Sequence, residues 1–292
     1  MRRACALALC LAVAGTATLA GSQAKTVAVP ATARHDAATP ATPAPAGVPA
    51  ARCLYIPPGW ADRVVYYHSF DTAVDRPEIN TLGAKVLVGD AAGAPGLAGR
   101  GCRFEPDRKN KRGLGLTGLA LPLHRPLTLS MWWRLEAPMK AESGFGLISM
   151  HGKGFMSNFV AGKGSWCALR EPTFVAQVYN WPGVSNINDI YEGPAWVDPA
   201  VWHHAAMVVS KGSQVRILWD GALKADLALK GRLLTPADAA ESIEFGPGGS
   251  ALPITIDEVM VLDVALEAGA IRDYMTAVRH LAAAGVPVLS AM

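Results

Sequence analysis

The sequence predicts an all-β domain of the sandwich type with one helix near the C-terminus. Apolar and polar residues alternate over several short segments, which is the period of a strand buried on one face. The 29 glycines and 21 prolines of the chain separate these segments. Many short strands with such turns are typical of a β-sandwich. The one clear helical pattern has apolar residues at i, i+3, i+4 and i+7, namely Ile271, Tyr274, Met275 and Val278.

The N-terminal segment has the features of a secretory signal peptide. Residues 1–3 are basic at two positions, residues 4–20 are apolar and uncharged, and small residues suited to signal peptidase follow. The apolar run is shorter than the roughly 20 residues that a membrane-spanning helix needs, and no other stretch is long enough. We therefore expect residues 1–24 to be a signal peptide. The mature chain would be secreted, periplasmic or in the cell envelope, without an integral membrane span.

Composition divides the rest of the chain in two. Residues 25–51 are nearly all Ala, Pro, Thr and Val, and we expect a disordered linker there. Residues 52–292 have a globular composition, and their length suits one large β domain. With 27 Lys and Arg against 24 Asp and Glu, the net charge is only +3, so no basic field indicates a nucleic-acid partner. Residues 103–112 form the one dense charge cluster, which we interpret as a solvated loop.

The cysteines allow one disulfide. Cys5 and Cys10 lie in the predicted signal peptide, which leaves Cys53, Cys102 and Cys167. Export permits a disulfide, and we prefer Cys53–Cys102, which would tie the start of the domain to a later segment. Three cysteines leave one over, so the pairing stays open. Their spacing matches no zinc site.

The individual strands follow from alternation and from apolar runs. They are expected at residues 64–70, 127–135, 145–150, 174–179 and 254–262. Residues 202–226 predict a hairpin followed by a second turn, because Asp220-Gly221 between apolar runs suits a two-residue turn with positive φ. The neighbouring His203 and His204 should face opposite sides of their strand, one of them in the core, so a paired metal site is not expected.

Three stretches in order resemble a known family. These are Trp202-His203-His204, the hairpin VRILWDG at residues 215–221, and IDEV at residues 256–259 leading into the helix. Together with residues 67–71 and 127–134, they resemble the laminin-G-like branch of the concanavalin A-like lectin/glucanase superfamily. The resemblance runs from Tyr66 to Tyr274. It implies an antiparallel jelly-roll sandwich with one short C-terminal helix, and it allows glycan binding, protein binding or scaffolding.

The sequence departs from this family at two places. Glu267 stands where the family has a helix-capping Ser, so the first turn of the helix should lack its usual cap. Residues 144–198 match nothing in particular.

Catalytic groups are not evident. Retaining glycosidases need two carboxyls about 5 Å apart. The nearest pair, Asp257 and Glu258, is adjacent on a strand and should point to opposite faces. The resemblance implies instead that Asp257 bonds to nearby backbone. Residues 176–180 are similar to one strand of the jelly-roll alginate lyases, whose other signatures are absent. An enzyme would need two carboxyls, or a Tyr/His pair, on one concave face.

Aromatic residues in the middle segment are the candidate binding residues. Aromatic rings suit the apolar faces of sugars, and loops on a rigid sandwich commonly carry binding sites. The candidates are Trp166, Tyr179, Asn180, Trp181, Tyr191 and Trp196. They could equally pack a small satellite core. Oxygen ligands for a possible Ca²⁺ are Asn186, Asn188, Asp189 and Asp198, and family members often carry this ion.

Taken together, the sequence predicts an exported, non-catalytic recognition module for extracellular or envelope glycans. Two alternatives stay open. One is a glycan-cleaving enzyme, either a glycoside hydrolase or a polysaccharide lyase. The other is a structural or protein-binding domain.

Overall fold

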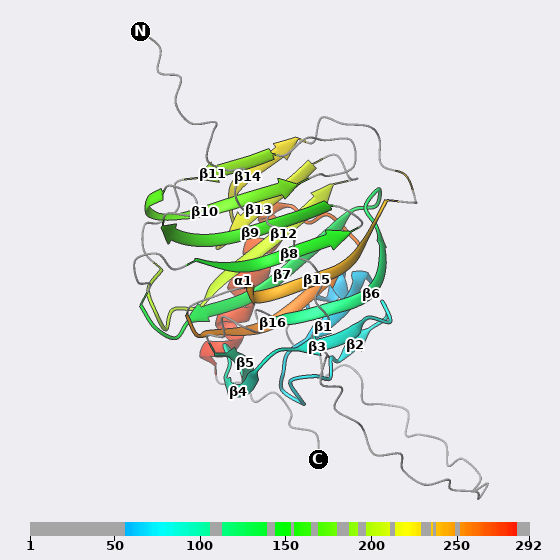
Figure 1. The fold of residues 1–292 in the computed structure, drawn as a ribbon. Helices are drawn as coiled ribbons and strands as arrows, with labels where there is room; N and C mark the ends of the chain where they lie inside the picture. Colours follow the sequence, from blue (N-terminus) through cyan, green and yellow to red (C-terminus); the bar gives the residue numbers. More distant parts are fainter. Residues whose placement is uncertain are drawn as a thin grey trace, which may run out of the picture. The chain divides into compact units, whose positions relative to one another are not determined.

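The structure is a computed structural model of the chain (Figure 1). It describes residues 56–105, 113–138, 144–152, 155–164, 169–179, 187–191, 197–210, 214–228, 235, 238–248 and 252–284. Within these, it gives the backbone alone for residues 58, 144–145, 155–164, 169–179, 187–191 and 247–248. All of them belong to one compact unit, residues 48–292. The predicted signal peptide and linker lie outside the described residues and stay predictions.

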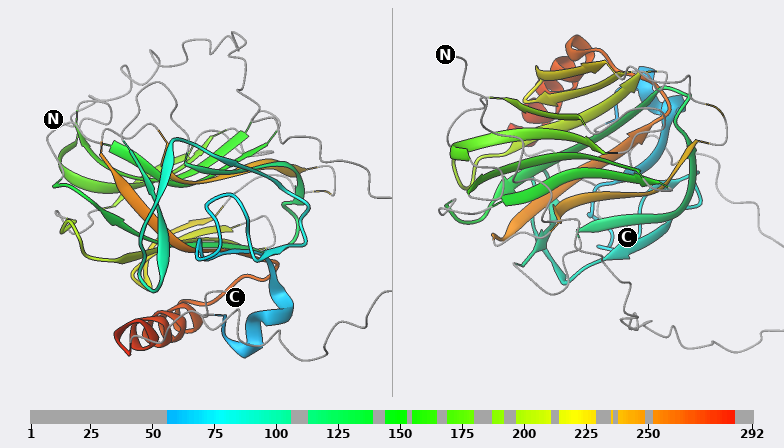
Figure 2. Two further views of the ribbon diagram at one scale, coloured as in Figure 1. Left: turned by 90° about the horizontal axis from the view of Figure 1, so that it is seen from below. Right: turned by 45° about the horizontal axis from the view of Figure 1, so that its top comes forward.

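The described strands form two antiparallel sheets that stack face to face, as expected for a sandwich (Figures 1 and 2). Sheet A has the order β14-β13-β12-β7-β16-β1-β2, and β5 joins it by pairing with β16 and with β4. Its strands are β1 (Val64–His68), β2 (Ile79–Asn80), β4 (Ala91–Pro95), β5 (Arg100–Phe104), β7 (Leu127–Leu135), β12 (His203–Ser210), β13 (Gln214–Trp219), β14 (Ala222–Ala228) and β16 (Ile254–Leu262).

Sheet B is the front layer of Figure 1 and has the order β11-β10-β9-β8-β15-β6-β3. Its strands are β3 (Lys85–Val88), β6 (Leu114–Pro122), β8 (Gly144–Gly152), β9 (Phe155–Gly164), β10 (Leu169–Tyr179), β11 (Ile187–Tyr191) and β15 (Ala239–Gly248). The consecutive strands β8 to β11 are neighbours in this sheet and widen it on one side.

Most of the predicted elements are confirmed. β7 and β16 have the predicted bounds, whereas β1 ends at His68 and the chain turns into positive φ at Phe70. The hairpin is present, and Asp220 and Gly221 have φ of 47° and 72° between β13 and β14. The helix α1 spans Ala268–Ala283 and buries the four predicted apolar residues. Short strands such as β4, made of Ala, Gly and Pro, were not predicted, because these residues have low strand propensity.

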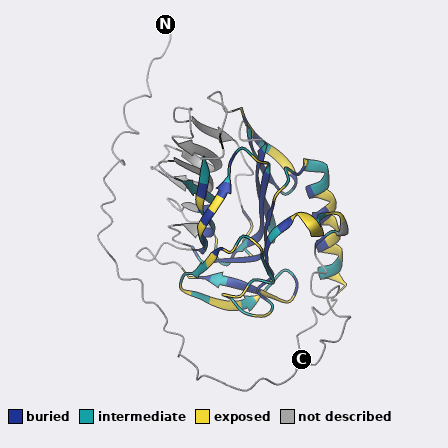
Figure 3. Ribbon diagram, turned by 90° about the vertical axis from the view of Figure 1, so that its right-hand side faces the viewer, coloured by how far each residue is buried: buried dark blue, intermediate teal, exposed yellow. Residues whose placement is uncertain are grey.

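The domain has two apolar clusters. The main core lies between the sheets and includes Leu129, Met131 and Trp133 of β7. A second cluster lies on the outer side of sheet A, where α1 and the 3₁₀-helix η2 (Pro58–Arg63) cover Trp132 and other residues (Figures 2 and 3). The central strands of sheet A are therefore buried on both faces, which explains why nearly every residue of β7, β12 and β16 is inaccessible.

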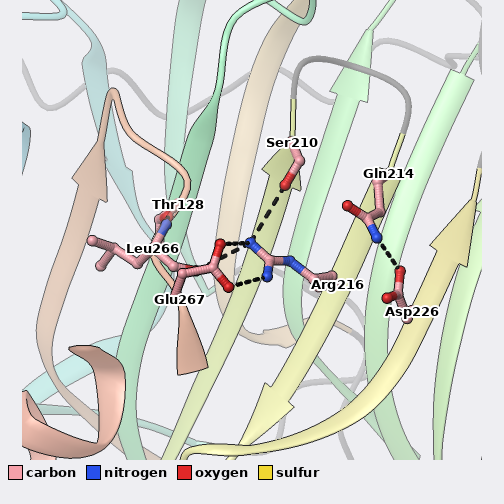
Figure 4. A network of polar contacts seen from close by, with 7 residues as sticks. All are labelled: Thr128, Ser210, Gln214, Arg216, Asp226, Leu266 and Glu267. Atoms are coloured by element: carbon pink, nitrogen blue, oxygen red, sulfur yellow. Dashed lines mark hydrogen bonds and ion pairs between the residues drawn. The ribbon is translucent and has the colours of Figure 1, made fainter. Parts of the chain in front are cut away.

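The helix N-terminus is held without a side-chain cap, as the departure from the family pattern predicts. Glu267 is the N-cap residue and makes no capping hydrogen bond. Its carboxylate instead accepts two hydrogen bonds from the Arg216 guanidinium, at 2.7 and 3.2 Å (Figure 4). Arg216 also donates to Leu266 O, and Thr128 Oγ1 accepts from Leu266 N at 3.0 Å. Side chains of sheet A thus fix the start of α1.

None of the helices in the described part of the chain has the length and apolar character needed to cross a membrane.

Candidate functional site

The structure leaves most of the predicted binding residues untested. Trp166, Asn180, Trp181 and Trp196 lie outside the described residues, and so does Asn186. Tyr179 ends β10, while Asn188, Asp189 and Tyr191 belong to β11, all described as backbone alone. Asp198 is exposed. Within the described residues, no group of three or more His, Cys, Asp or Glu side chains is arranged to hold a metal ion.

The predicted disulfide also stays a prediction. Cys102 is fully buried with a free thiol, and burial raises the pKa of that thiol to about 12. Its proposed partner Cys53 lies outside the described residues, as does Cys167.

The outer face of sheet B carries a row of polar positions that follows the strand register. Glu244 of β15 pairs with Gly115 of β6 and with Ser149 of β8. The flanking residues Ile243 and Phe245 belong to the core between the sheets, so Glu244 and its pairs lie on the outer face. Through β9, β10 and β11 the register continues the row, which comprises Gly115, Glu244, Ser149, Asn158, Gln177 and Asn188. We call this set the polar row.

A second row runs beside the polar row. Ser242 of β15 pairs with Thr117 of β6 and with His151 of β8. His151 pairs with Met156 of β9, which pairs in turn with the predicted binding residue Tyr179. Tyr179 therefore occupies the same outer-face row as His151, two strands away. Tyr191 pairs with Phe174, five residues before Tyr179 in β10, so its position belongs to the opposite face.

The described members of these rows offer several kinds of hydrogen-bonding group. Ser149, His151, Ser242 and Thr117 are half-buried. Burial lowers the pKa of His151, so its imidazole is neutral at pH 7 and can donate one hydrogen bond and accept another. Glu244 accepts a hydrogen bond from Gly113 N at 3.1 Å, which helps to fix its carboxylate. Hydroxyl, imidazole and carboxylate groups side by side suit a ligand rich in hydroxyl groups.

Sequence reasoning missed this surface for an identifiable reason. Ser149 and His151 alternate with the core residues Ile148 and Met150, a signal that was present in the sequence. Residues 145–150 nevertheless suggested only a short apolar strand. The pairing of Ser149 with Glu244, nearly a hundred residues later in the chain, is not visible without the fold.

The two adjacent histidines face opposite sides, as predicted. His204 is fully buried under α1, where its Nε2 lies 2.8 Å from Ser130 Oγ, and burial lowers the pKa of His204 to about 3. His203 is half-buried, bonds to Asp220 Oδ2 through Nδ1 at 2.7 Å, and stacks on Trp219. The Ser130–His204 pair cannot meet a substrate, because both side chains are enclosed by the second apolar cluster.

The prediction that Asp257 and Glu258 face opposite sides is wrong. β16 bulges between Asp257 and Met260, and Glu258 has φ of 49°. Ile256 and Val259 both enter the main core, so the two acidic residues between them share the outer side of sheet A. Asp257 accepts hydrogen bonds from the backbone N–H groups of Leu97 and Glu258, each at 2.8 Å, which confirms its predicted bonding to backbone. Both carboxyl groups are fully buried and do not form a hydrolase pair that a glycan could reach.

Comparison with known proteins agrees with this architecture. A laminin-G-type family model, described as Concanavalin A-like lectin/glucanases superfamily, matches residues 109–272, more than half of the chain. No curated protein sequence matches significantly.

Solved structures similar to this chain include binding domains of botulinum neurotoxins. One is the binding domain of Paraclostridial Mosquitocidal Protein 1, with 13% identity, a TM-score of 0.52, and coverage of 73% of this chain and 51% of that one. Another is the binding domain of botulinum neurotoxin DC in complex with rat synaptotagmin II (12% identity, TM-score 0.54, 74% and 51% covered). The same domain in complex with SialylT gives 12% identity, a TM-score of 0.51, and 75% and 52% covered. The match spans about half the length of these solved chains, and at such identity it shows the jelly-roll fold alone.

Proposed function

Because this chain belongs to the concanavalin A-like lectin/glucanases superfamily, we propose that it is an exported, non-catalytic recognition module that binds carbohydrate. The observation that carries the proposal is the polar row on the outer face of sheet B. A binding role agrees with the structural neighbours, which are themselves binding domains.

The polar row has the dimensions of an oligosaccharide site. It crosses six strands from β6 to β11, and neighbouring strands lie about 4.8 Å apart, so its length is on the order of 24 Å. Ser149 and Glu244 offer directional hydrogen bonds near one end. In this proposal Trp166, Trp181 and Trp196 supply flat apolar surface against sugar rings, and Tyr179 contributes from the adjacent row.

The proposal also includes export of the chain and a Ca²⁺ ion. Residues 1–24 direct export, so the partners are extracellular or envelope glycans. The candidate Ca²⁺ ligands are the oxygen-bearing side chains of Asn186, Asn188, Asp189 and Asp198. Asn188 and Asp189 occupy opposite faces of β11, so one ion would use one of these two residues. A protein partner is the alternative at the same surface, since one structural neighbour is solved in complex with rat synaptotagmin II.

A glycan array probed with the purified protein, with and without Ca²⁺, tests the proposal. Ser149→Leu places an apolar branched side chain in the polar row. We expect it to weaken binding about tenfold or more, which is at least ~1.4 kcal/mol. Thr276→Leu, at an exposed position of α1 on the other side of the molecule, is the matched control and should bind as the wild type does. A silent array, or a Ser149→Leu variant with unchanged affinity, contradicts glycan recognition by this face and favours a protein partner.

One observation favours a second candidate function, a polysaccharide lyase. The enzyme alternative needs a Tyr/His pair that converges on one concave face, and the positions of His151 and Tyr179 share one outer-face row, two strands apart. The two groups could remove a proton from a sugar ring and return one to the leaving oxygen. Incubation with uronate polymers tests this by the ultraviolet absorbance of an unsaturated product. An absorbance increase in the wild type that disappears in both His151→Ala and Tyr179→Phe would establish lyase activity. No increase in the wild type would support the non-catalytic binding module.

A further inference from the structure

Strand β6 and the residue before it contain three glycines, and the fold requires two of them. A Cβ atom on Gly113 would collide with Phe245 O, so this position must be glycine for β6 and β15 to approach each other. Gly118 has φ of 71°, which is the left-handed region that favours glycine. The third glycine, Gly115, is under neither of these constraints.

Position 115 has room for an alanine side chain. Of the described residues, only Leu87 comes within 4 Å of an added Cβ atom, with its own Cβ atom at 3.6 Å and its carbonyl oxygen at 3.7 Å. These are ordinary van der Waals distances, and the φ angle of Gly115 is not positive. Glycine weakens a strand, because it loses more backbone freedom than alanine and has no side chain to pack. A glycine that the fold does not require is typical of a place where a ligand approaches the backbone closely.

Gly115 lies between two side chains on the outer face of sheet B. It pairs with Leu87 of β3 on one side and with Glu244 of β15 on the other, and the three strands are neighbours in the front layer of Figure 1. Val86 and Val88 pack against the main core, so Leu87 is directed to the outer face, where it is half-buried. Strands β3 and β15 are two strand spacings apart, or about 10 Å. We call Leu87, Gly115 and Glu244 the Gly115 notch.

Glu244 borders the notch and does not fill it. Its side chain is not within 4 Å of the Cβ atom added to Gly115, and its Oε1 accepts a hydrogen bond from Gly113 N at 3.1 Å. A carboxylate has about four lone-pair sites, so one such hydrogen bond leaves it able to accept others. The notch therefore has a floor of strand backbone, an apolar wall at Leu87 and a hydrogen-bond acceptor at Glu244.

We propose that the Gly115 notch is a subsite that holds one pyranose ring of the bound glycan by its apolar face. This inference rests on the proposed function of the polar row. A pyranose ring carries C–H groups on its faces and hydroxyl groups at its edge. In the notch, the C–H face lies on the backbone of Gly115 and against Leu87, while hydroxyl groups at the edge donate to Glu244. Gly115 is thus a specificity-determining residue, because its missing side chain lets the ring reach both partners.

A single methyl group at position 115 should disturb this arrangement. It would hold the ring away from the floor, and a gap of about 1 Å already removes a quarter to a half of the dispersion energy of a contact. The same displacement would lengthen the hydrogen bonds from the ring hydroxyls to Glu244, which weaken beyond about 3 Å. The expected effect on binding is therefore large for so small a change.

Thermal unfolding of the full chain and titration of the full chain over a printed glycan array test the subsite. Gly115→Ala should unfold at the same temperature as the wild type or at a higher one, because alanine suits a strand better than glycine does. The same variant should bind glycans about tenfold or more weakly, which is at least ~1.4 kcal/mol. Stability that is kept while binding is lost is not expected of a residue whose role is structural alone.

Two further variants make the test specific to the notch. Leu87→Ala removes the apolar wall and adds no volume, and it should weaken glycan binding about threefold or more. Ala120→Ser is the matched control, because it adds one atom at an exposed position of β6 outside the polar row, and it should bind as the wild type does.

The outcomes separate this inference from the proposed function. A wild type that binds no glycan on the array contradicts both. A wild type that binds glycans, with Gly115→Ala equal to it, overturns the subsite and leaves glycan binding in place. A lower unfolding temperature for Gly115→Ala also overturns the inference, because the fold would then require this glycine, and so does equal weakening by Ala120→Ser. Weaker binding by Gly115→Ala and Leu87→Ala, with the control unchanged, supports the subsite.

Discussion

His204 should make this domain acid-labile by an amount that the structure allows us to calculate. Its imidazole is fully buried beneath α1, and burial lowers its pKa from 6.5 to about 3. In the folded state the ring therefore stays neutral, while in the unfolded state it takes up a proton below pH 6.5. Because the folded pKa is the lower one, stability from this group is fully present above pH 6.5 and is lost as the pH falls toward 3.

The magnitude follows from the size of the shift. Each pKa unit corresponds to about 1.4 kcal/mol, so a titration starting at pH 6.5 removes about 2 kcal/mol by about pH 5 and about 3 kcal/mol by about pH 4. This is a large part of the roughly 5–15 kcal/mol by which a domain is stable. Acid should therefore lower the free energy of unfolding already between about pH 6.5 and about pH 5, before most carboxylates are protonated.

Urea unfolding of the wild type and of His204→Gln, at several values between about pH 7 and about pH 4, measures the effect. Gln keeps a polar group beside Ser130 and does not titrate. Any stability that the substitution itself costs is therefore the same at every pH and does not affect the slope of the unfolding free energy against pH. His280→Gln removes an exposed imidazole of α1 and is the matched control, with the wild-type slope. If the free energies of unfolding of the wild type and of His204→Gln differ by the same amount at every pH, the burial of a neutral His204 does not cause the acid lability.

Three further predictions rest on other contacts. Gly221→Ala should destabilise the domain by about 2 kcal/mol, because the new Cβ atom clashes with the Arg272 side chain and the backbone is strained at φ +72°. Gly118→Ala is the control, since Gly118 has φ +71° but open space around it, and it should lose only about 1 kcal/mol through backbone strain. Thermal unfolding of both variants tests this, and equal losses of stability would refute the clash. A double-mutant cycle on Arg216→Ala and Glu267→Ala should give a coupling energy of only about 0.5 kcal/mol, because the Glu267 side chain is 76% exposed. A coupling energy near zero would mean that Arg216 stabilises the domain through its hydrogen bond to Leu266 O and not through Glu267. Non-reducing peptide mapping should find Cys53 linked to Cys102; if Cys102 is instead alkylated only after unfolding, the free buried thiol is the native form.

The parts of the fold that the sequence predicted are those set by local pattern. The strand at Leu127–Leu135 and the turn at Asp220-Gly221 could be predicted because alternation and turn chemistry are properties of neighbouring residues. The same reasoning failed at Glu258, where a bulge cancels the alternation that adjacent strand residues normally show. β4 and β5 escaped prediction because β5 is held by pairing with β16, about 150 residues later in the chain.

The candidate site was less predictable than the fold. Aromatic composition directed attention to residues 166–196, and of those candidates Tyr179 is the one that the register places in the same row as His151, two strands away. The polar row joins Gly115, Ser149 and Glu244 from three separate strands, and each is an ordinary alternating residue in its own strand. A surface built across strands becomes visible only when the register is known.

The position of α1 has a consequence for synthesis of the protein. Every strand of sheet A precedes this helix in the chain, so the sheet can be complete while its cover is still missing. In that interval Trp132, Tyr67 and Met260, all enclosed in the finished domain, would face water on one broad apolar surface. Such a surface attracts other unfinished chains. The pace at which the last turns of the helix emerge and dock therefore limits how much of the protein reaches its native state without a chaperone.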